Sequence, residues 1–146
     1  MRKRILLVLA AILSISASAT RADDDHAYTF GPVMIVSFVR TQPGMFEDYL
    51  RYLDGPYKRL MEESKKQGII VDYAIYGARP RDGQDADLVL TVTYKNMAAF
   101  DGLQSRSDPI AKEVFGSLGK AASAAVDREK LRKEVGSVQV RQLILK

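Results

Sequence analysis

The stretch that decides the fold is Val33-Met34-Ile35-Val36-Ser37-Phe38-Val39, which is rich in β-branched residues and almost wholly apolar. Gly31-Pro32 precedes it, and Thr41-Gln42-Pro43-Gly44 ends it. A short apolar run between turn signals predicts a strand. Alternate residues of a strand point to opposite faces, and here both sets are apolar, so the sequence predicts a strand that is buried on both faces.

The next segment, from Met45 to Gln67, predicts a kinked helix that ends at Gly68. Its apolar residues recur at helical spacing, with charges between them: Phe46, Tyr49, Leu50, Leu53, Tyr57, Leu60 and Met61. Asp54-Gly55-Pro56 lies inside this pattern, and a proline there removes one backbone hydrogen bond. We therefore expect a kink, with Asp54 capping the second half of the helix.

The rest of the chain predicts two more helical stretches and three more strands. Strands are expected at 69–78, 88–94 and 137–145. A short helix is expected after Asn96, and a second helical stretch restarts at Asp108-Pro109 and continues over 120–134, with Gly136 as its stop signal. The order strand, helix, strand, strand, helix, strand is that of the α+β ferredoxin-like βαββαβ fold. Its four-stranded antiparallel sheet places the first and third strands at the centre.

The doubly apolar first strand also predicts an assembly. Two helices cover only one face of a four-stranded sheet, so the other face needs a separate cover. A second copy of the same sheet is the economical solution, because a large aliphatic surface open to water favours aggregation. We expect a homodimer whose two sheets form a dimeric α+β barrel.

The first 22 residues are typical of a signal peptide. Arg2-Lys3-Arg4 precede an apolar run over 5–15 that is too short to span a bilayer, and small residues follow. Cleavage after Ala22 is favoured, with Ala19 as the second choice. The domain is then expected over 31–146, after a flexible arm at 23–30, and is exported to the periplasm or secreted. An uncleaved membrane anchor is the alternative; after cleavage no stable membrane anchor remains.

Removing this leader changes the charge balance. Of 22 basic and 18 acidic residues, the leader holds four basic and no acidic ones, so 18 of each remain. A mature chain of 124 residues and zero net charge gives no support for nucleic-acid binding. The chain also has no cysteine, which excludes disulfides, thiol catalysis and thiolate metal sites.

Two segments resemble the dimeric α+β barrel superfamily, especially antibiotic-biosynthesis-monooxygenase-like and NIPSNAP-like domains. Residues 39–50, VRTQPGMFEDYL, are similar to the opening strand, Pro-Gly turn and helix of these families, and residues 88–103 to their third strand and following helix. The resemblance implies a dimeric shell with a cavity and transfers no reaction; the leader makes this chain an exported form of such a domain. Haem-handling members use a histidine within the domain, whereas the single histidine here is His26.

Candidate ligand-binding residues are polar or aromatic groups on the expected strands and at the helix start: Asp72, Tyr73, Tyr76, Tyr94, Asn96 and Arg141. Such groups in an apolar cavity bind small amphipathic molecules. Tyrosine hydroxyls also orient or deprotonate a phenolic substrate, in the cofactor-free style of the monooxygenase-like relatives. The alternative is that the tyrosines only pack and that Asp72 keeps an edge strand soluble.

No metal or cofactor site is expected. His26 follows three aspartates but falls in the expected arm, where a solvated tail is the simpler interpretation. The charged loop holds Arg79, Arg81, Asp82, Asp85 and Asp87; it is either an anion or partner contact or a solvated loop of mixed sign. The charged residues from 127 to 133 are interpreted as solvent-facing surface.

The sequence therefore predicts an exported homodimer that binds a small apolar or aromatic molecule, with no catalytic residue identified. One alternative is a cofactor-independent monooxygenase-like enzyme that uses Tyr73, Tyr76 or Asn96. Another is a structural or stress-related dimer without a ligand.

Overall fold

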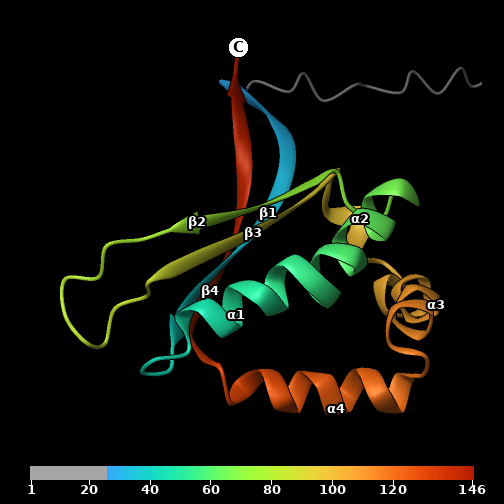
Figure 1. The fold of residues 1–146 in the computed structure, drawn as a ribbon. Coiled ribbons are helices and arrows are strands. Elements are labelled where there is room, and N and C mark those ends of the chain that lie inside the picture. The colour runs from blue at the N-terminus through green and yellow to red at the C-terminus, as the bar shows by residue number, and fades with distance from the viewer. Residues whose placement is uncertain (1–25) are drawn as a thin grey trace, which may run out of the picture.

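The computed structural model describes residues 26–146. The expected signal peptide and its two cleavage positions lie outside the described residues. The elements in chain order are β1 (Tyr28–Thr41), α1 (Phe46–Tyr52), the π-helical turn η1 (Leu53–Tyr57), α2 (Lys58–Lys66), β2 (Asp72–Gly77), β3 (Leu88–Tyr94), the 3-10 turn η2 (Met97–Phe100), α3 (Leu103–Phe115), α4 (Leu118–Glu129) and β4 (Arg132–Leu145) (Figure 1). None of the helices described is long and apolar enough to cross a bilayer.

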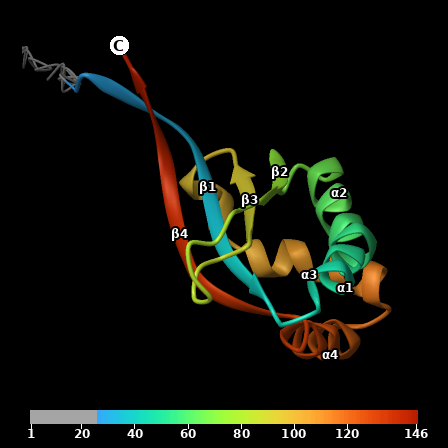
Figure 2. The ribbon, with the colours of Figure 1, turned by 60° about the vertical axis from the view of Figure 1, so that its left-hand side comes forward.

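The sheet confirms the α+β ferredoxin-like prediction. Its strand order is β2-β3-β1-β4, and each neighbouring pair is antiparallel. The first and third strands therefore occupy the centre, as their apolar composition predicts. Figure 2 shows the helices gathered on one side of this sheet.

The kink in the long helical segment falls where the proline predicts it. Gly55 has φ −95° and ψ −108°, which is not helical, and Pro56 follows it inside η1. Tyr49, Leu53 and Tyr57 keep a spacing of four residues across the kink and are all buried. The expected cap is wrong, because Asp54 makes no cap hydrogen bond and its Oδ1 instead accepts from Lys58 Nζ at 2.9 Å.

The helix-facing side of the sheet carries the core. Val33 and Val39 of β1 are 0% and 1% exposed, and they pair with Tyr94 and Leu88 of β3. The buried residues of this core fall into two clusters: Val39, Tyr49, Leu53, Tyr57, Leu88 and Leu90 form the first, and Ile69, Ile70 and Ile110 the second. Alternation along the strands then places Met34, Val36 and Phe38 on the opposite side.

That opposite side, the open face, has no helix packed on it among the elements described (Figure 2). Strand register assigns to it Met34, Val36, Phe38, Ala74, Tyr76, Val89, Thr91, Thr93, Val138 and Val140. Four of its members are appreciably exposed: Phe38 at 37%, Val140 at 38%, Val138 at 44% and Tyr76 at 55%. The first strand is thus apolar on both faces, as expected. One of these two faces is uncovered in the single subunit.

The C-terminal part differs from the prediction. Helix was expected over 120–134, but α4 ends at Glu129 and β4 begins at Arg132. The reason is pairing: β1 continues to Thr41, and residues 132–134 of β4 pair with its last three residues before an irregularity at Val135. Charged residues with good helix propensity are drawn into a strand because the long central strand needs a partner there.

Two smaller differences lie in the helical segments. Asp108-Pro109 lies in the middle of α3 and does not start a helix. The break comes instead at Gly116, with φ +86°, and Ser117 caps α4 by accepting a hydrogen bond from the Lys120 N–H. A left-handed glycine followed by a serine cap is a strong stop and start signal.

The ends of β1 and β4 project beyond the rest of the sheet as a two-stranded ribbon (Figure 1). β3 pairs with β1 only from Val33 onward, whereas the earlier part of β1 pairs with β4 alone, out to Tyr28 opposite Leu145. The last residues of the expected arm, 28–30, thus belong to β1. Phe30 and Leu143 of this ribbon are 55% and 51% exposed.

Candidate functional site

A partly open cavity of about 150 Å³, called the interior cavity below, lies between the helix-facing side of the sheet and the helical layer. β1 and β3 supply an aliphatic floor, α1 and η1 supply two tyrosines, and α4 and β4 supply charged groups. The lining residues are Ile35, Ser37, Val39, Tyr49, Tyr57, Leu90, Val92, Arg128, Arg132 and Glu134.

The two tyrosines face the cavity because the helix periodicity turns them toward the sheet. Tyr49 and Tyr57 are 1% and 8% exposed. Within the described residues neither hydroxyl makes a hydrogen bond. Burial raises the pKa of Tyr49 and of Tyr57, so both phenols are neutral hydrogen-bond donors at ordinary pH.

Arg132 is a buried cation held by two carboxylates. It is 5% exposed, and its guanidinium lies 3.1 Å from Glu129 Oε1 and 3.3 Å from Glu134 Oε2. Its Nε is buried without an acceptor. Such a group persists in an interior because its carboxylate partners offset the cost of desolvation.

Arg128 differs from Arg132 because no carboxylate in the described part of the chain pairs with it. Its Nε is also buried without an acceptor. Arg128 lines the interior cavity and also an outer groove of about 510 Å³, whose apolar wall includes Tyr52, Pro56 and Phe115. The cavity thus combines an aliphatic floor with two neutral donors and one cation, Arg128, that no carboxylate of residues 26–146 pairs with.

None of the six residues expected from the sequence lines this cavity. Asp72 is exposed at the sheet edge, where Lys65 Nζ lies 2.8 Å from Oδ1 and holds the pKa of the carboxyl below its usual range. Tyr73 donates from its hydroxyl to Glu62 Oε1 at 2.7 Å. Burial, followed by this bond, raises the pKa of Tyr73 to about 12. Tyr76 lies on the open face and is 55% exposed.

The other three residues lie at, beyond or level with the C-terminal end of β3, the end at which Asp72 pairs with Thr93. Tyr94 packs on Phe100, with ring centroids 4.6 Å apart. Asn96 precedes η2, but its side chain makes no cap hydrogen bond. Arg141 lies over the Phe30 ring, with Cζ 3.7 Å from the centroid, and its Nε is buried without an acceptor. Only Tyr94 and Arg141 share a row of the sheet, on either side of Val33.

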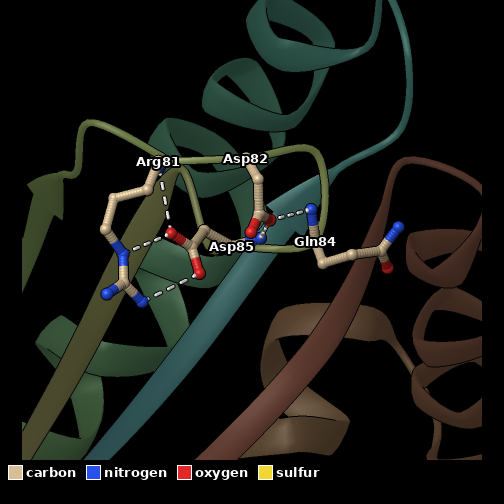
Figure 3. Close-up of polar contacts among 4 residues, drawn as sticks. All are labelled: Arg81, Asp82, Gln84 and Asp85. Carbon is tan, nitrogen blue, oxygen red and sulfur yellow. Dashed lines mark hydrogen bonds and ion pairs between the residues drawn. The ribbon is translucent and has the colours of Figure 1, made fainter.

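The charged loop between β2 and β3 satisfies its own charges. Arg81 Nε lies 2.9 Å from Asp85 Oδ2, and Asp82 Oδ1 accepts the backbone N–H of Gln84 at 2.7 Å (Figure 3). Asp87 accepts from the N–H and hydroxyl of Thr41, which fixes the end of the loop to β1. These contacts give the loop its shape. Of Arg81, Asp82, Asp85 and Asp87, the cation is Arg81, and because it is paired with Asp85 it is not available to an anionic ligand.

The sequence does not predict the cavity residues, for identifiable reasons. Tyr49 and Tyr57 are recognisable from the sequence as helix-face residues, but their spacing gives no sign of a void beside them. Arg128 and Arg132 fall in the stretch interpreted as solvent-facing, and that interpretation is wrong for the buried Arg132. The helical four-residue spacing of these two arginines is no guide to their placement, because Arg128 lies on α4 and Arg132 begins β4.

Among the residues described, no group of three His, Cys, Asp or Glu side chains is placed to hold a metal ion. The His26 ring stacks on Tyr28, with centroids 5.6 Å apart, at the start of the ribbon.

No family model and no curated protein matches the chain. Two similar solved structures are HapK from Hahella chejuensis and a dimeric ferredoxin-like protein from an uncultured marine organism. The first is 11% identical, with a TM-score of 0.49, and the match covers 75% of this chain and 91% of HapK. The second is 14% identical, with a TM-score of 0.43, covering 82% of this chain and 97% of the other. Neither likeness assigns an activity.

Proposed function

We propose that this protein is exported, forms a homodimer through its open faces, and binds a small aromatic or apolar molecule in the interior cavity of each subunit. The observation that carries the binding proposal is the cavity itself, where buried donors without partners face an aliphatic floor. A buried donor that lacks an acceptor costs about 1–3 kcal/mol. A ligand that satisfies such donors recovers this cost.

Binding is favoured over oxygenation by the placement of the residues an oxygenase would need. Tyr73 points toward the helices and is bonded to Glu62, Tyr76 lies on the other face of the sheet, and Asn96 is exposed beyond β3. These three groups do not converge on one substrate. A cofactor-independent reaction needs its acid or base within hydrogen-bond reach of a single reacting atom.

The dimer proposal rests on the extent of the open face. Four strands span roughly 19 Å, and the seven paired positions of β1 and β3 span roughly 23 Å. With the ribbon of β1 and β4, the projected area is roughly 600 Å². The corrugated accessible area is larger, on the order of the 800 Å² per subunit that a stable interface buries.

Export is supported by the composition of the N-terminal segment, in which basic residues, a short apolar run and small residues follow one another. Intact mass measurement of protein recovered from the cell envelope should give the mass of residues 23–146. A full-length mass in that fraction would overturn the cleavage.

The dimer is tested by placing a charge on the open face. Val138 on the open face and Val126 on α4 are 44% and 66% exposed, so aspartate at either position should leave the subunit folded. In sedimentation velocity at micromolar concentration, the wild type and Val126→Asp should be dimers and Val138→Asp a monomer. A monomeric wild type refutes the dimer.

Ligand binding is tested by native mass spectrometry of the purified protein. We expect a small molecule to be retained by the wild type and by Ser123→Leu on the outer surface of α4. Ser37→Leu fills the cavity and should abolish retention while circular dichroism stays unchanged. If the wild type retains no molecule and binds none from a panel of one-ring aromatics, the ligand-free structural dimer is the better description.

A further inference from the structure

We infer that the interior cavity selects an aromatic carboxylate, a molecule of the benzoate class, whose carboxylate binds Arg128. This inference deepens the proposed function and rests on it. The observation behind it is the contrast between two neighbouring arginines. Arg132 has two carboxylates, Glu129 and Glu134, within 3.3 Å, whereas Arg128 has none in the described part of the chain and its Nε lacks an acceptor.

The charge of the lining favours an anion. The cavity lining holds two guanidinium groups, Arg128 and Arg132, and one carboxylate, Glu134, which is a net charge of +1. Of the two cations, Arg128 is the one with no carboxylate partner in the described part of the chain. A partly buried guanidinium without an anion is costly, and a carboxylate matches its planar, two-pronged donor geometry. The hydroxyls of Tyr49 and Tyr57 add two neutral donors beside it. Both hydroxyls can donate a hydrogen bond to the same carboxylate, because an ionised carboxylate accepts at about four lone pairs.

The size and floor of the cavity favour one aromatic ring. Its volume is about 150 Å³, and an apolar cavity of about 150 Å³ in another protein holds one benzene molecule. Ile35, Leu90 and Val92 offer the flat aliphatic surface of the sheet to such a ring. A fused two-ring ligand is too large for this space.

The outer groove and the cavity share Arg128 in their linings. The groove wall includes Tyr52, Pro56 and Phe115. An aromatic carboxylate in the groove therefore meets apolar surface and the anchoring cation together. Asp127 and Lys130 at this groove pair with each other at 2.7 Å, so they add no net charge there.

The experiment compares two one-ring probes, benzoate and benzyl alcohol, by isothermal titration calorimetry on the purified protein. Wild type should bind benzoate at least tenfold more tightly than benzyl alcohol. Arg128→Met should lose at least tenfold in benzoate affinity and keep its benzyl alcohol affinity within twofold. Arg59→Met, at an exposed arginine outside the cavity, should match the wild type with both probes.

Thermal melts check that each variant is folded. If Arg128→Met is not, Arg128→Lys keeps the charge without the planar fork and should lose threefold or more in benzoate affinity alone. Equal wild-type affinity for the two probes, or unchanged benzoate binding in a folded Arg128 variant, overturns the carboxylate inference and leaves the aromatic site standing. Failure of both probes to bind the wild type overturns the aromatic site itself.

Discussion

The Tyr49→Phe substitution should make the ligand-free protein more stable. The Tyr49 ring is 1% exposed, and its hydroxyl makes no hydrogen bond within the described residues. Burying a hydroxyl without a partner costs about 1–3 kcal/mol, and phenylalanine removes that cost while keeping the ring and its packing. We expect a gain of about 1 kcal/mol, which corresponds to a rise in Tm of roughly 3–5 °C for a domain of this size.

The assay is urea unfolding followed by circular dichroism on protein freed of ligand by refolding. Tyr73→Phe is the matched control, because its hydroxyl does have an acceptor, Glu62 Oε1 at 2.7 Å. That variant should lose roughly 0.5 kcal/mol, the low end for a hydrogen bond at a solvated position. A loss of 1 kcal/mol or more in Tyr49→Phe would mean that the buried hydroxyl has a partner, and the reasoning about unpaired donors would be refuted.

Three further perturbations test the fold. Ile110→Ala removes a side chain that is 0% exposed in the core, so urea unfolding should show a loss of about 2–5 kcal/mol. Gly116→Ala places a Cβ at φ +86° and should cost about 1 kcal/mol, whereas Gly83→Ala, with open space and no positive φ, should change stability by less than about 0.5 kcal/mol. The pKa of Tyr73 is raised to about 12. The folded state therefore holds a proton that the unfolded state releases near pH 10. The free energy of unfolding should fall as the pH rises from 10 to 12, and it should fall less steeply in Tyr73→Phe. Denaturation midpoints at pH 9 and pH 11.5 measure this slope.

The architecture was accessible from the sequence because its strongest signals are local. The apolar run 33–39, the turn at Pro43-Gly44 and the proline at Pro56 each dictate a structure with their immediate neighbours. The start of β4 was not accessible in this way. Residues 132–134 favour helix by composition, and they become strand only because β1, some ninety residues earlier, extends far enough to pair with them.

The candidate site was less accessible, for a different physical reason. A cavity forms where the surrounding side chains leave space unfilled in the folded protein, and a pattern of residues in the sequence does not predict such a space. The residues expected to bind were chosen for polarity on strands, yet Asp72 and Tyr73 are satisfied by the helix beside them. Arg128 and Arg132 have the same residue type and nearly the same context in sequence, but only the folded chain gives carboxylates to one of them.

The pairing of β1 with β4 has a consequence for when this chain can fold. The first described strand, central in the sheet, has one edge completed only by the last strand, with Tyr28 opposite Leu145. Contacts between such distant segments form late, because a long loop must close before they stabilise anything. The sheet therefore stays incomplete until the whole polypeptide is available. For a protein proposed to be exported, this delay keeps the nascent chain extended enough to be threaded through a translocation pore before its native structure locks.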